Sequence, residues 1–308
     1  MNKKNYLTIT LAVLAVIAFF VVLFVEKSQK ANASDPAATG TPTVTYPRIV
    51  SLVPSVTETL FMLGLGEHVI ARSDYCDFPA EVTNRPAMGS LGNVSVEAIA
   101  RMKPDWVILS EAQAQSKLHT AFANLRINHL GVPSDSLEDI MQSIWDLGDK
   151  FEAQDNATVW LEQFDKTVAA ARAAAPDKKP RVLICAGRDP GDLRRVYISG
   201  KGNFYEDIIK IAGGVNAYDG HLPYPMVSLE GIAQMNPDII IDIITGPSVD
   251  AAVVGDALYQ WSRLPSINAV ATTDVHVLTD PWAVRPGPRI GLLIETFSSY
   301  VQEWSRKE

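Results

Sequence analysis

The sequence contains only two cysteines, Cys76 and Cys185, among its 308 residues. Two cysteines are too few for the disulfide scaffold that stabilises many small secreted domains. They can form a single bridge in an oxidising compartment, or they can remain buried thiols, which is the more common state of isolated cysteines. Because no cysteine precedes Cys76, we expect no lipid-modified cysteine near the amino terminus.

Catalytic and cofactor-binding motifs are also missing. There is no Walker A loop, no Gly-x-Ser-x-Gly elbow and no His-Glu-x-x-His helix. The five histidines are scattered and no two lie within four residues of each other, so a local zinc motif is absent. We therefore expect no catalytic residues, no metal and no cofactor. An enzyme whose site is assembled only in three dimensions remains the alternative of another class.

Positive charge is scarce as well. The chain has 27 Lys and Arg against 35 Asp and Glu, which gives a net charge of −8. A nucleic-acid-binding protein normally carries a basic face, so we expect no nucleic-acid partner. The hydrophobic fraction of 47% is typical of a globular protein with a large core.

The amino-terminal segment differs from the rest. Two lysines precede an uncharged run of 20 residues, 6–25, and a helix of that length spans about 30 Å, the thickness of a bilayer core. Residues 31–33 (Ala-Asn-Ala) have the form of a signal-peptide cleavage site. Residues 1–33 are thus predicted to be a membrane anchor or a cleaved signal peptide, and both export the remaining chain. Residues 34–46 are predicted to be a flexible tether.

The next hundred residues alternate between strand and helix patterns. Short apolar runs predict strands at 48–53, 68–71, 106–109 and 127–130. After the first strand, Ser55 and Glu58 have the spacing of a capping box, and Gly64 is expected to end the helix. Alternating strands and helices predict a parallel sheet covered on both faces. We assign residues 47–150 to an amino-terminal α/β lobe.

A long helix and a second series follow. Trp160, Phe164, Val168 and Ala171 form one apolar stripe, which predicts a helix over about residues 155–175. Apolar runs at 181–186, 239–244 and 275–278 predict further strands. The sequence therefore predicts an α/β fold of two doubly wound lobes, joined by one backbone helix within 151–178, with a carboxy-terminal lobe at 179–308 and a ligand cleft between them.

An internal repeat supports two related lobes. Residues 94–108 match residues 227–241 at nine of fifteen positions, with an offset of 133 residues. In each copy we expect a capping serine (Ser95 or Ser228), a glutamate in the first helical turn, a Pro-Asp turn and a buried strand. Two copies at this separation indicate two related domains and not a solenoid.

The two glutamates of the repeat, Glu97 and Glu230, can have either of two roles. A carboxylate in the first turn of a helix stabilises the helix dipole by about 0.3–1 kcal/mol. Alternatively, two matching lobes present two matching acidic groups to a partner. The residues alone leave both readings open.

Loops that follow the predicted strands carry the candidate ligand-binding residues, because ligands of open α/β sheets bind at the carboxyl ends of strands. Aromatic faces and guanidinium groups on stiff loops suit a large conjugated or anionic ligand. The alternative is that these side chains pack at the lobe edges. The predicted ligand-binding residues are Tyr75, Arg188, Tyr224, Asp280, Trp282 and Arg285.

From residue 47 to about residue 303, the chain resembles the periplasmic-binding-protein family that serves cobalamin, haem and iron-siderophore importers. The motifs that carry the resemblance are 48–52 (RIVSL), 55–58 (SVTE), 74–79 (DYCDFP), the two Ser-x-Glu-x-Ile copies, 213–216 (GGVN) and Pro288-Arg289. The resemblance implies a non-catalytic, monomeric binding protein on the periplasmic side of the cytoplasmic membrane. It also implies that Glu97 and Glu230 dock on the permease dimer of an ABC importer, which works with its ATPase subunits.

Among family members, the chain looks most similar to those that bind vitamin B12, which implies a corrinoid ligand such as cobalamin or cobinamide. However, Leu91 stands where those members have one tryptophan, and Ser110 and Glu111 stand where another follows the strand at 107–108. An iron-siderophore and haem therefore remain alternative ligands. A membrane-tethered sensor on the same fold remains an alternative function.

Overall fold

A computed structural model describes residues 47–307 except 91, 190 and 247. The predicted anchor or signal segment and the tether, residues 1–46, lie outside the described residues. No helix within the described part of the chain combines the length and the apolar character needed to cross a membrane.

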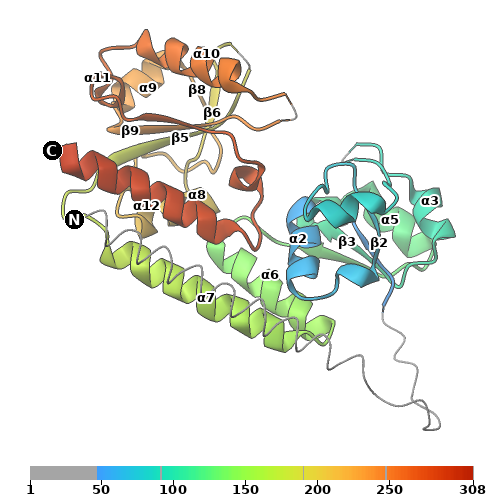
Figure 1. The fold of residues 1–308 in the computed structure, drawn as a ribbon. Coiled ribbons are helices and arrows are strands. Elements are labelled where there is room, and N and C mark those ends of the chain that lie inside the picture. Colours follow the sequence, from blue (N-terminus) through green and yellow to red (C-terminus); the bar gives the residue numbers. More distant parts are fainter. Residues whose placement is uncertain (1–46, 91, 190, 247, 308) are drawn as a thin grey trace, which may run out of the picture. The chain divides into compact units, whose positions relative to one another are not determined.

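The amino-terminal lobe is built on a parallel four-stranded sheet with the order β2-β1-β3-β4 (Figure 1). Its strands are β1 (Ile49–Ser51), β2 (Val69–Arg72), β3 (Trp106–Ser110) and β4 (His129–Val132). Its helical elements are α2 (Pro54–Met62), η1 (Gly66–His68), η2 (Ala80–Asn84), α3 (Val96–Arg101), α4 (Glu111–Ala114) and α5 (Lys117–Asn124). All four predicted strands are confirmed.

Strand β4 begins two residues later than the sequence predicts. The residues just before β4 form the turn that follows α5, in which Arg126 adopts a left-handed conformation with φ of 55°. The N–H of Ile127 then donates to the carbonyl of Phe122, which closes the end of the helix. Sheet pairing within β4 therefore starts at His129.

The predicted capping box at the start of α2 is wrong. Val53 is the N-cap residue, Pro54 occupies the first turn, and no side chain caps the helix. Glu58 instead binds two arginines of the other lobe, so its carboxylate is not available to the helix. The helix ends as expected, because Gly64 follows it with φ of +80°.

The carboxy-terminal lobe contains a six-stranded sheet with the order β10-β9-β5-β6-β8, in which β7 also pairs with β5. The strands are β5 (Arg181–Arg188), β6 (Val196–Ile198), β7 (Val215–Asn216), β8 (Met226–Val227), β9 (Ile239–Ile243) and β10 (Val275–Leu278). The helical elements are α8 (Phe204–Ile211), α9 (Leu229–Met235), α10 (Ala251–Ser262), α11 (Asn268–Ala271) and η3 (Pro281–Val284). The three predicted strands are confirmed, but β6 and β8 add an antiparallel edge that was not predicted.

Three long helices lie beside the two sheets: α6 (Leu137–Lys150), α7 (Gln154–Ala173) and α12 (Ile290–Lys307) (Figure 1). The predicted stripe of α7 is confirmed, because Phe164 and Ala171 are buried and Trp160 and Val168 pack against the core. Helix α7 also hydrogen-bonds to both lobes. Asn156 donates to the carbonyl of Leu63, and the indole N–H of Trp160 donates to the carbonyl of Pro288 at 2.9 Å.

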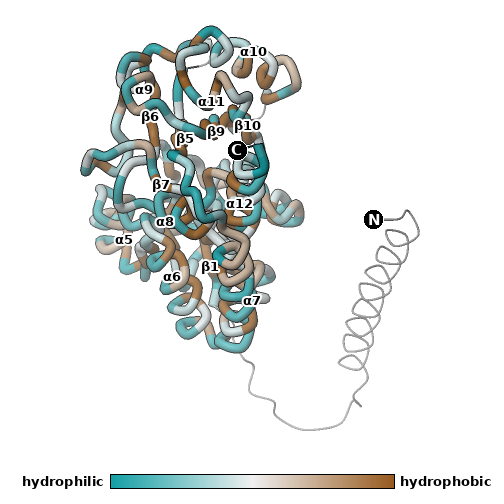
Figure 2. Tube along the Cα trace, turned by 90° about the vertical axis from the view of Figure 1, so that its left-hand side faces the viewer, coloured by the Kyte–Doolittle hydropathy of each residue, from teal (hydrophilic) through white to brown (hydrophobic). Residues whose placement is uncertain are grey.

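The central strands of the second sheet are mostly hydrophobic (Figure 2), and their successive side chains point to opposite faces of the sheet. One face of each sheet packs on its own helices, forming a cluster around Ile99 and Phe122 in the first lobe and a cluster around Ile232 and Trp261 in the second. The other faces belong to one continuous cluster that includes α6, α7, α8 and α12. Apolar packing therefore runs without interruption from one sheet to the other.

The internal repeat extends into the three-dimensional structure as a matched brace. In the first lobe, Asp105 accepts the backbone N–H of Arg48, and the Arg48 guanidinium donates to the carbonyl of Met102. In the second lobe, Asp238 accepts the N–H of Arg181 at 2.9 Å, and the Arg181 guanidinium donates to the carbonyl of Met235.

In the first lobe, this brace joins the start of β1 to the end of α3. In the second lobe, it joins the start of β5 to the end of α9. Lys103 and Asn236, which follow the helices, both have positive φ angles, of 49° and 41°. One prediction of the repeat is wrong: Ser228 caps α9 through its side chain, but Ser95 makes no such bond in α3. The aspartate of the Pro-Asp turn therefore makes the same bond in both copies, whereas the serine caps the helix in only one.

Replacement of Arg181 by Ala is expected to lower the free energy of unfolding by about 1–3 kcal/mol. The substitution leaves the carbonyls of Met235 and Ala217 without their side-chain donor. Urea denaturation followed by circular dichroism measures the change. Arg263→Ala is the matched control, because the exposed Arg263 side chain makes no bond to another described residue. Equal stability of both variants would show that the brace does not stabilise the lobe.

Candidate ligand-binding cleft

A cavity lies at the carboxyl ends of the strands of the second lobe. It has a volume of about 710 Å³ and is lined by the ends of β5 and β9, the start of α10 and Val284. Most of its lining is apolar, including Ile243, Ile244 and Val253. A volume of this size is within the range of small-molecule sites, and carboxyl strand ends are where open α/β sheets bind ligands.

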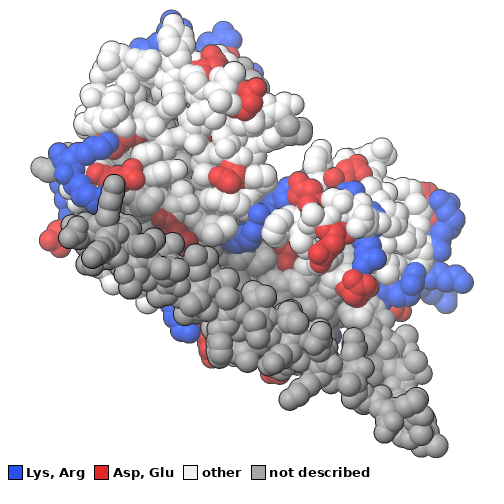
Figure 3. Space-filling view, viewed as in Figure 1, with Lys and Arg blue, Asp and Glu red and all other residues white. Residues whose placement is uncertain are grey.

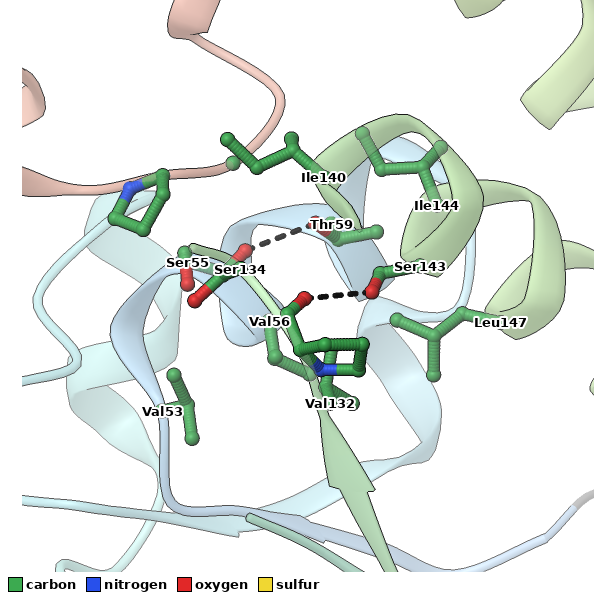
Figure 4. Close-up of a pocket in the computed structure, with 13 residues that line it drawn as sticks. Val53, Ser55, Val56, Thr59, Val132, Ser134, Ile140, Ser143, Ile144 and Leu147 are labelled. Carbon is green, nitrogen blue, oxygen red and sulfur yellow. Dashed lines mark hydrogen bonds between the residues drawn. The ribbon is translucent and has the colours of Figure 1, made fainter. Parts of the chain in front are cut away.

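A much smaller pocket marks the seam between the first lobe and the 286–287 turn (Figure 4). Its volume is about 10 Å³, which is enough for about one water molecule. Ser143 donates to the carbonyl of Pro133 beside it, at 2.7 Å. A Cβ atom on Gly287 would come within 2.9 Å of the Ser55 Cβ, so the two lobes touch here at backbone distance. This pocket is a packing seam and not a ligand site.

An ion-pair network joins the lobes next to this seam. Glu58 of α2 has a side chain only 2% exposed, and Arg289 donates to it through Nε at 2.8 Å and through Nη2 at 2.5 Å. Arg285 adds a single longer bond of 3.3 Å to the same carboxylate. A buried carboxylate requires such partners, because an isolated buried charge is strongly unfavourable.

Asp77 completes the network from the 74–79 loop. Its carboxylate accepts two bonds from Arg285, of 2.5 and 3.0 Å, in the bidentate geometry typical of Arg–carboxylate pairs. The hydrogen bonds from Arg285 hold the pKa of the Asp77 carboxyl below its usual value. Basic and acidic side chains accordingly meet where the two lobes approach each other (Figure 3).

Aromatic side chains lie on the loops that carry Asp77 and Arg285, and another lies on the 223–225 turn. Tyr75 is 59% exposed and Phe78 is also exposed, although the Arg289 guanidinium lies 4.0 Å from the Phe78 ring. Trp282 is half-buried against the core. Tyr224 is exposed on its Pro-x-Pro turn, and partial burial together with the nearby Asp135 charge raises the pKa of its phenol to about 12. Exposed rings beside a charged seam can stack on a large planar ligand.

Two of the predicted ligand-binding residues, Arg188 and Asp280, do not belong to this ion-pair network. Arg188 lines the 710 Å³ cavity, but its side chain is only 4% exposed and forms a salt bridge of 2.9 Å with the buried Asp242. Asp280 is exposed and forms no ion pair with another residue in the described part of the chain. Of the six predicted residues, Arg285 has the most direct connection to the other lobe.

The cysteines are not paired. Cys76 and Cys185 are both buried free thiols, as the more common state of isolated cysteines suggests. Cys76 lies 3.0 Å from the Thr57 hydroxyl, and burial raises the pKa of the Cys185 thiol well above its usual value. Within the described ranges, no group of three or more His, Cys, Asp and Glu side chains is arranged to hold a metal ion.

Glu97 and Glu230 are both exposed, one on α3 and one on α9. Neither forms an ion pair with another described residue. Each lies in the first turn of its helix, so the structure is compatible with dipole stabilisation as well as with a partner surface.

Sequence reasoning missed Glu58, Asp77 and Phe78 as members of the site. Glu58 was assigned to a helix cap because its spacing from Ser55 fits that motif. Glu58 is the one charged residue of α2, and the strand before the helix is apolar; this isolated charge is the signal that could have revealed it, since a buried charge needs a partner from elsewhere. No sequence pattern identifies which arginine that partner is.

Comparison with known proteins places these features in a family context. Residues 49–281 match the family model described as periplasmic binding protein. The chain is 26% identical over 264 residues to the vitamin B12-binding protein of Pectobacterium atrosepticum, covering 83% of this chain and 88% of that protein.

Solved structures of similar fold include the vitamin B12-binding protein BtuF of Vibrio cholerae, with a TM-score of 0.70, 23% identity, and coverage of 84% of this chain and 98% of that one. The haem-binding protein RhuT of Roseiflexus sp. RS-1 gives a TM-score of 0.72 at 23% identity, with 84% and 99% coverage. The predicted fold of two α/β lobes is thus confirmed.

Replacement of Glu58 by Gln is expected to lower the free energy of unfolding by about 3 kcal/mol, because two arginines at the seam lose their buried counter-ion. Thermal and urea denaturation measure the loss. Glu81→Gln provides the control, since the exposed Glu81 has no ion pair with a described residue. If both variants unfold at the same urea concentration, the network does not hold the lobes together.

Proposed function

Because the chain belongs to the periplasmic binding protein family, we propose that it is the extracytoplasmic binding protein of an ABC importer and that it delivers a corrinoid, cobalamin or cobinamide, to the permease. In this role it captures ligand without chemical turnover. Its partners are a permease dimer and the ATPase subunits that drive transport.

One observation carries the proposal: the matched placement of Glu97 and Glu230. Each is exposed and unpaired among the described residues, and each is borne by a helix that the Arg–Asp brace fixes to its lobe. A protein that only stores a ligand has no need of two equivalent acidic groups. A permease of two like subunits offers one basic site to each glutamate.

Two features support a large ligand. An apolar cavity of about 710 Å³ lies at the strand ends of the second lobe, and exposed or half-buried rings, including Tyr75, Tyr224 and Trp282, lie on loops of both lobes. Corrinoids combine an extended conjugated ring with polar side arms, so stacking and polar contacts are both used. The vitamin B12-binding relatives support this choice of ligand.

Haem or a ferric siderophore is the second candidate. The exposed phenol of Tyr75 favours it, because a tyrosine oxygen is a ligand for ferric iron. The haem-binding protein of similar fold is in accord with this alternative. The visible absorbance spectrum of protein purified from its native host distinguishes corrinoid, haem and ferric siderophore.

The location of the protein follows from the exported topology that residues 1–33 predict. We propose that it works on the periplasmic side of the cytoplasmic membrane, tethered by residues 1–33 or released after cleavage. N-terminal sequencing of the mature protein separates these cases, and a protein that begins at Ser34 is not anchored by this segment. A tethered sensor would bind ligand yet leave uptake unchanged when the gene is deleted.

We expect the protein to bind cobalamin or cobinamide one-to-one in calorimetry. Trp282→Ala is expected to weaken binding by about 5- to 150-fold, or about 1–3 kcal/mol, if its ring stacks on the ligand. Trp145→Ala is the control, because Trp145 is an exposed ring on α6 outside the predicted ligand-binding residues. Heat with a ferric siderophore or haem, but with neither corrinoid, would contradict the corrinoid assignment.

Glu97→Ala and Glu230→Ala are expected to reduce uptake strongly in cells, most of all when combined, and to leave ligand affinity unchanged. A glutamate desolvated against a permease arginine leaves that arginine unpaired when truncated, at a cost of about 2–5 kcal/mol. Helix stabilisation predicts instead a loss of about 0.3–1 kcal/mol in folding stability with normal uptake. Uptake, melting temperature and affinity are measured on the same variants. Normal uptake by the double variant would show that neither residue docks.

A further inference from the structure

Arg285 and Arg289 at the seam have counter-ions that differ in their exposure to solvent. Glu58, the partner of Arg289, is 2% exposed, whereas Asp77, the partner of Arg285, is 57% exposed. A buried pair is costly to break, because a charge is left in a poorly solvated place. A displaced Asp77 carboxylate is solvated by water, whereas a displaced Glu58 carboxylate would stay buried without a partner. The Asp77–Arg285 pair is therefore the more easily exchanged of the two.

Geometry makes Asp77 the principal counter-ion of Arg285. Asp77 fills the guanidinium fork with bonds of 2.5 and 3.0 Å, while Glu58 reaches Arg285 through one bond of 3.3 Å. The Glu58 carboxylate is already engaged twice by Arg289. If Asp77 moves away, Arg285 keeps a positive charge with at most one weak internal partner.

The Arg285 guanidinium can donate two parallel hydrogen bonds to any oxyanion with two suitably spaced oxygens. Carboxylates and phosphates both match a guanidinium in this bidentate manner. Arg285 is only 14% exposed, so an incoming anion meets it in a partly desolvated place where the attraction is stronger than in water. A neutral polar group cannot replace the Asp77 charge.

Aromatic residues are close in sequence to both members of the Asp77–Arg285 pair. Tyr75 and Phe78 flank Asp77 and are exposed, and Trp282 precedes Arg285 by one turn of η3. A ligand with a conjugated body and an anionic arm satisfies both kinds of surface at once.

We propose that Asp77 is an internal competitor for the anionic group of the ligand. A ligand carboxylate or phosphate displaces the Asp77 carboxylate from Arg285, so that the cleft selects ligands with an anionic arm over neutral ones of the same shape. This proposal rests on the ligand-binding function proposed above and names the chemistry that Arg285 recognises. Asp77 is a specificity-determining residue that lowers affinity for every ligand that must displace it.

The test compares ligands that differ in the anionic group. Cobalamin carries a phosphodiester that cobinamide lacks, and haem carries two carboxylates that its dimethyl ester lacks. Calorimetry with all four is performed on the wild-type protein and on Asp77→Asn, Arg285→Gln and the double variant. Asp74→Asn is the matched control, because it removes one charge from the same loop without a bond to Arg285.

Asp77→Asn is expected to tighten binding of the pair member that carries the anionic arm by about five- to tenfold and to change the member that lacks it less than twofold. Asp74→Asn is expected to change neither. Arg285→Gln is expected to weaken the anionic member at least tenfold and to abolish the gain from Asp77→Asn. The pair that responds, corrinoid or porphyrin, identifies the source of the anion.

Unchanged or weaker anion binding by Asp77→Asn, at a normal melting temperature, overturns the competitor role and leaves the binding function intact. Equal gains for both members of a pair overturn it as well, because they show a general loosening of the loop. If Asp77→Asn is unstable, Asp77→Ser takes its place with the same expected result. Failure of the wild-type protein to bind any of the four ligands overturns the corrinoid and haem assignments of the proposed function, and the competitor role with them.

Discussion

The buried carboxylate of Glu58 is the constraint on which the arrangement of the two lobes depends. It is almost fully shielded from water, and its partners Arg285 and Arg289 belong to the other lobe. A buried charge without partners is strongly unfavourable, so the 285–289 turn has to stay against α2. Close contact of Gly287 with Ser55 follows from that approach, because a side chain at Gly287 would not fit.

The remaining contacts between the lobes reinforce this arrangement without charge. One apolar cluster continues from the first sheet through α6, α7 and α12 to the second sheet. Helix α7 adds hydrogen bonds to both lobes, from Asn156 to Leu63 at the end of α2 and from Trp160 to Pro288. The lobes thus share a core, although each also has a separate core on its outer face.

Some features of the molecule occur in both lobes, and others occur in only one. The Arg–Asp brace occurs in both lobes, and it places Glu97 and Glu230 on equally fixed helices. The cleft side is not repeated: the first lobe contributes Glu58, Asp77 and exposed rings, whereas the second contributes arginines and the apolar cavity. In the proposed function, the repeated surface faces a permease of two like subunits and the unrepeated side faces the ligand.

The sequence alone determined the alternation of strands and helices, the apolar stripe of α7 and the repeat of 133 residues, because each is a local pattern set by side-chain periodicity or by direct identity. Tertiary structure decided the rest. The spacing of Ser55 and Glu58 fits a capping box, yet the carboxylate binds arginines more than 200 residues away, because pairing a buried charge outweighs one helix cap. Likewise, Arg188 reads as an exposed loop residue until the fold places Asp242 beside it. Local patterns fix the elements, but only long-range packing determines which charges become buried and which remain available to a ligand.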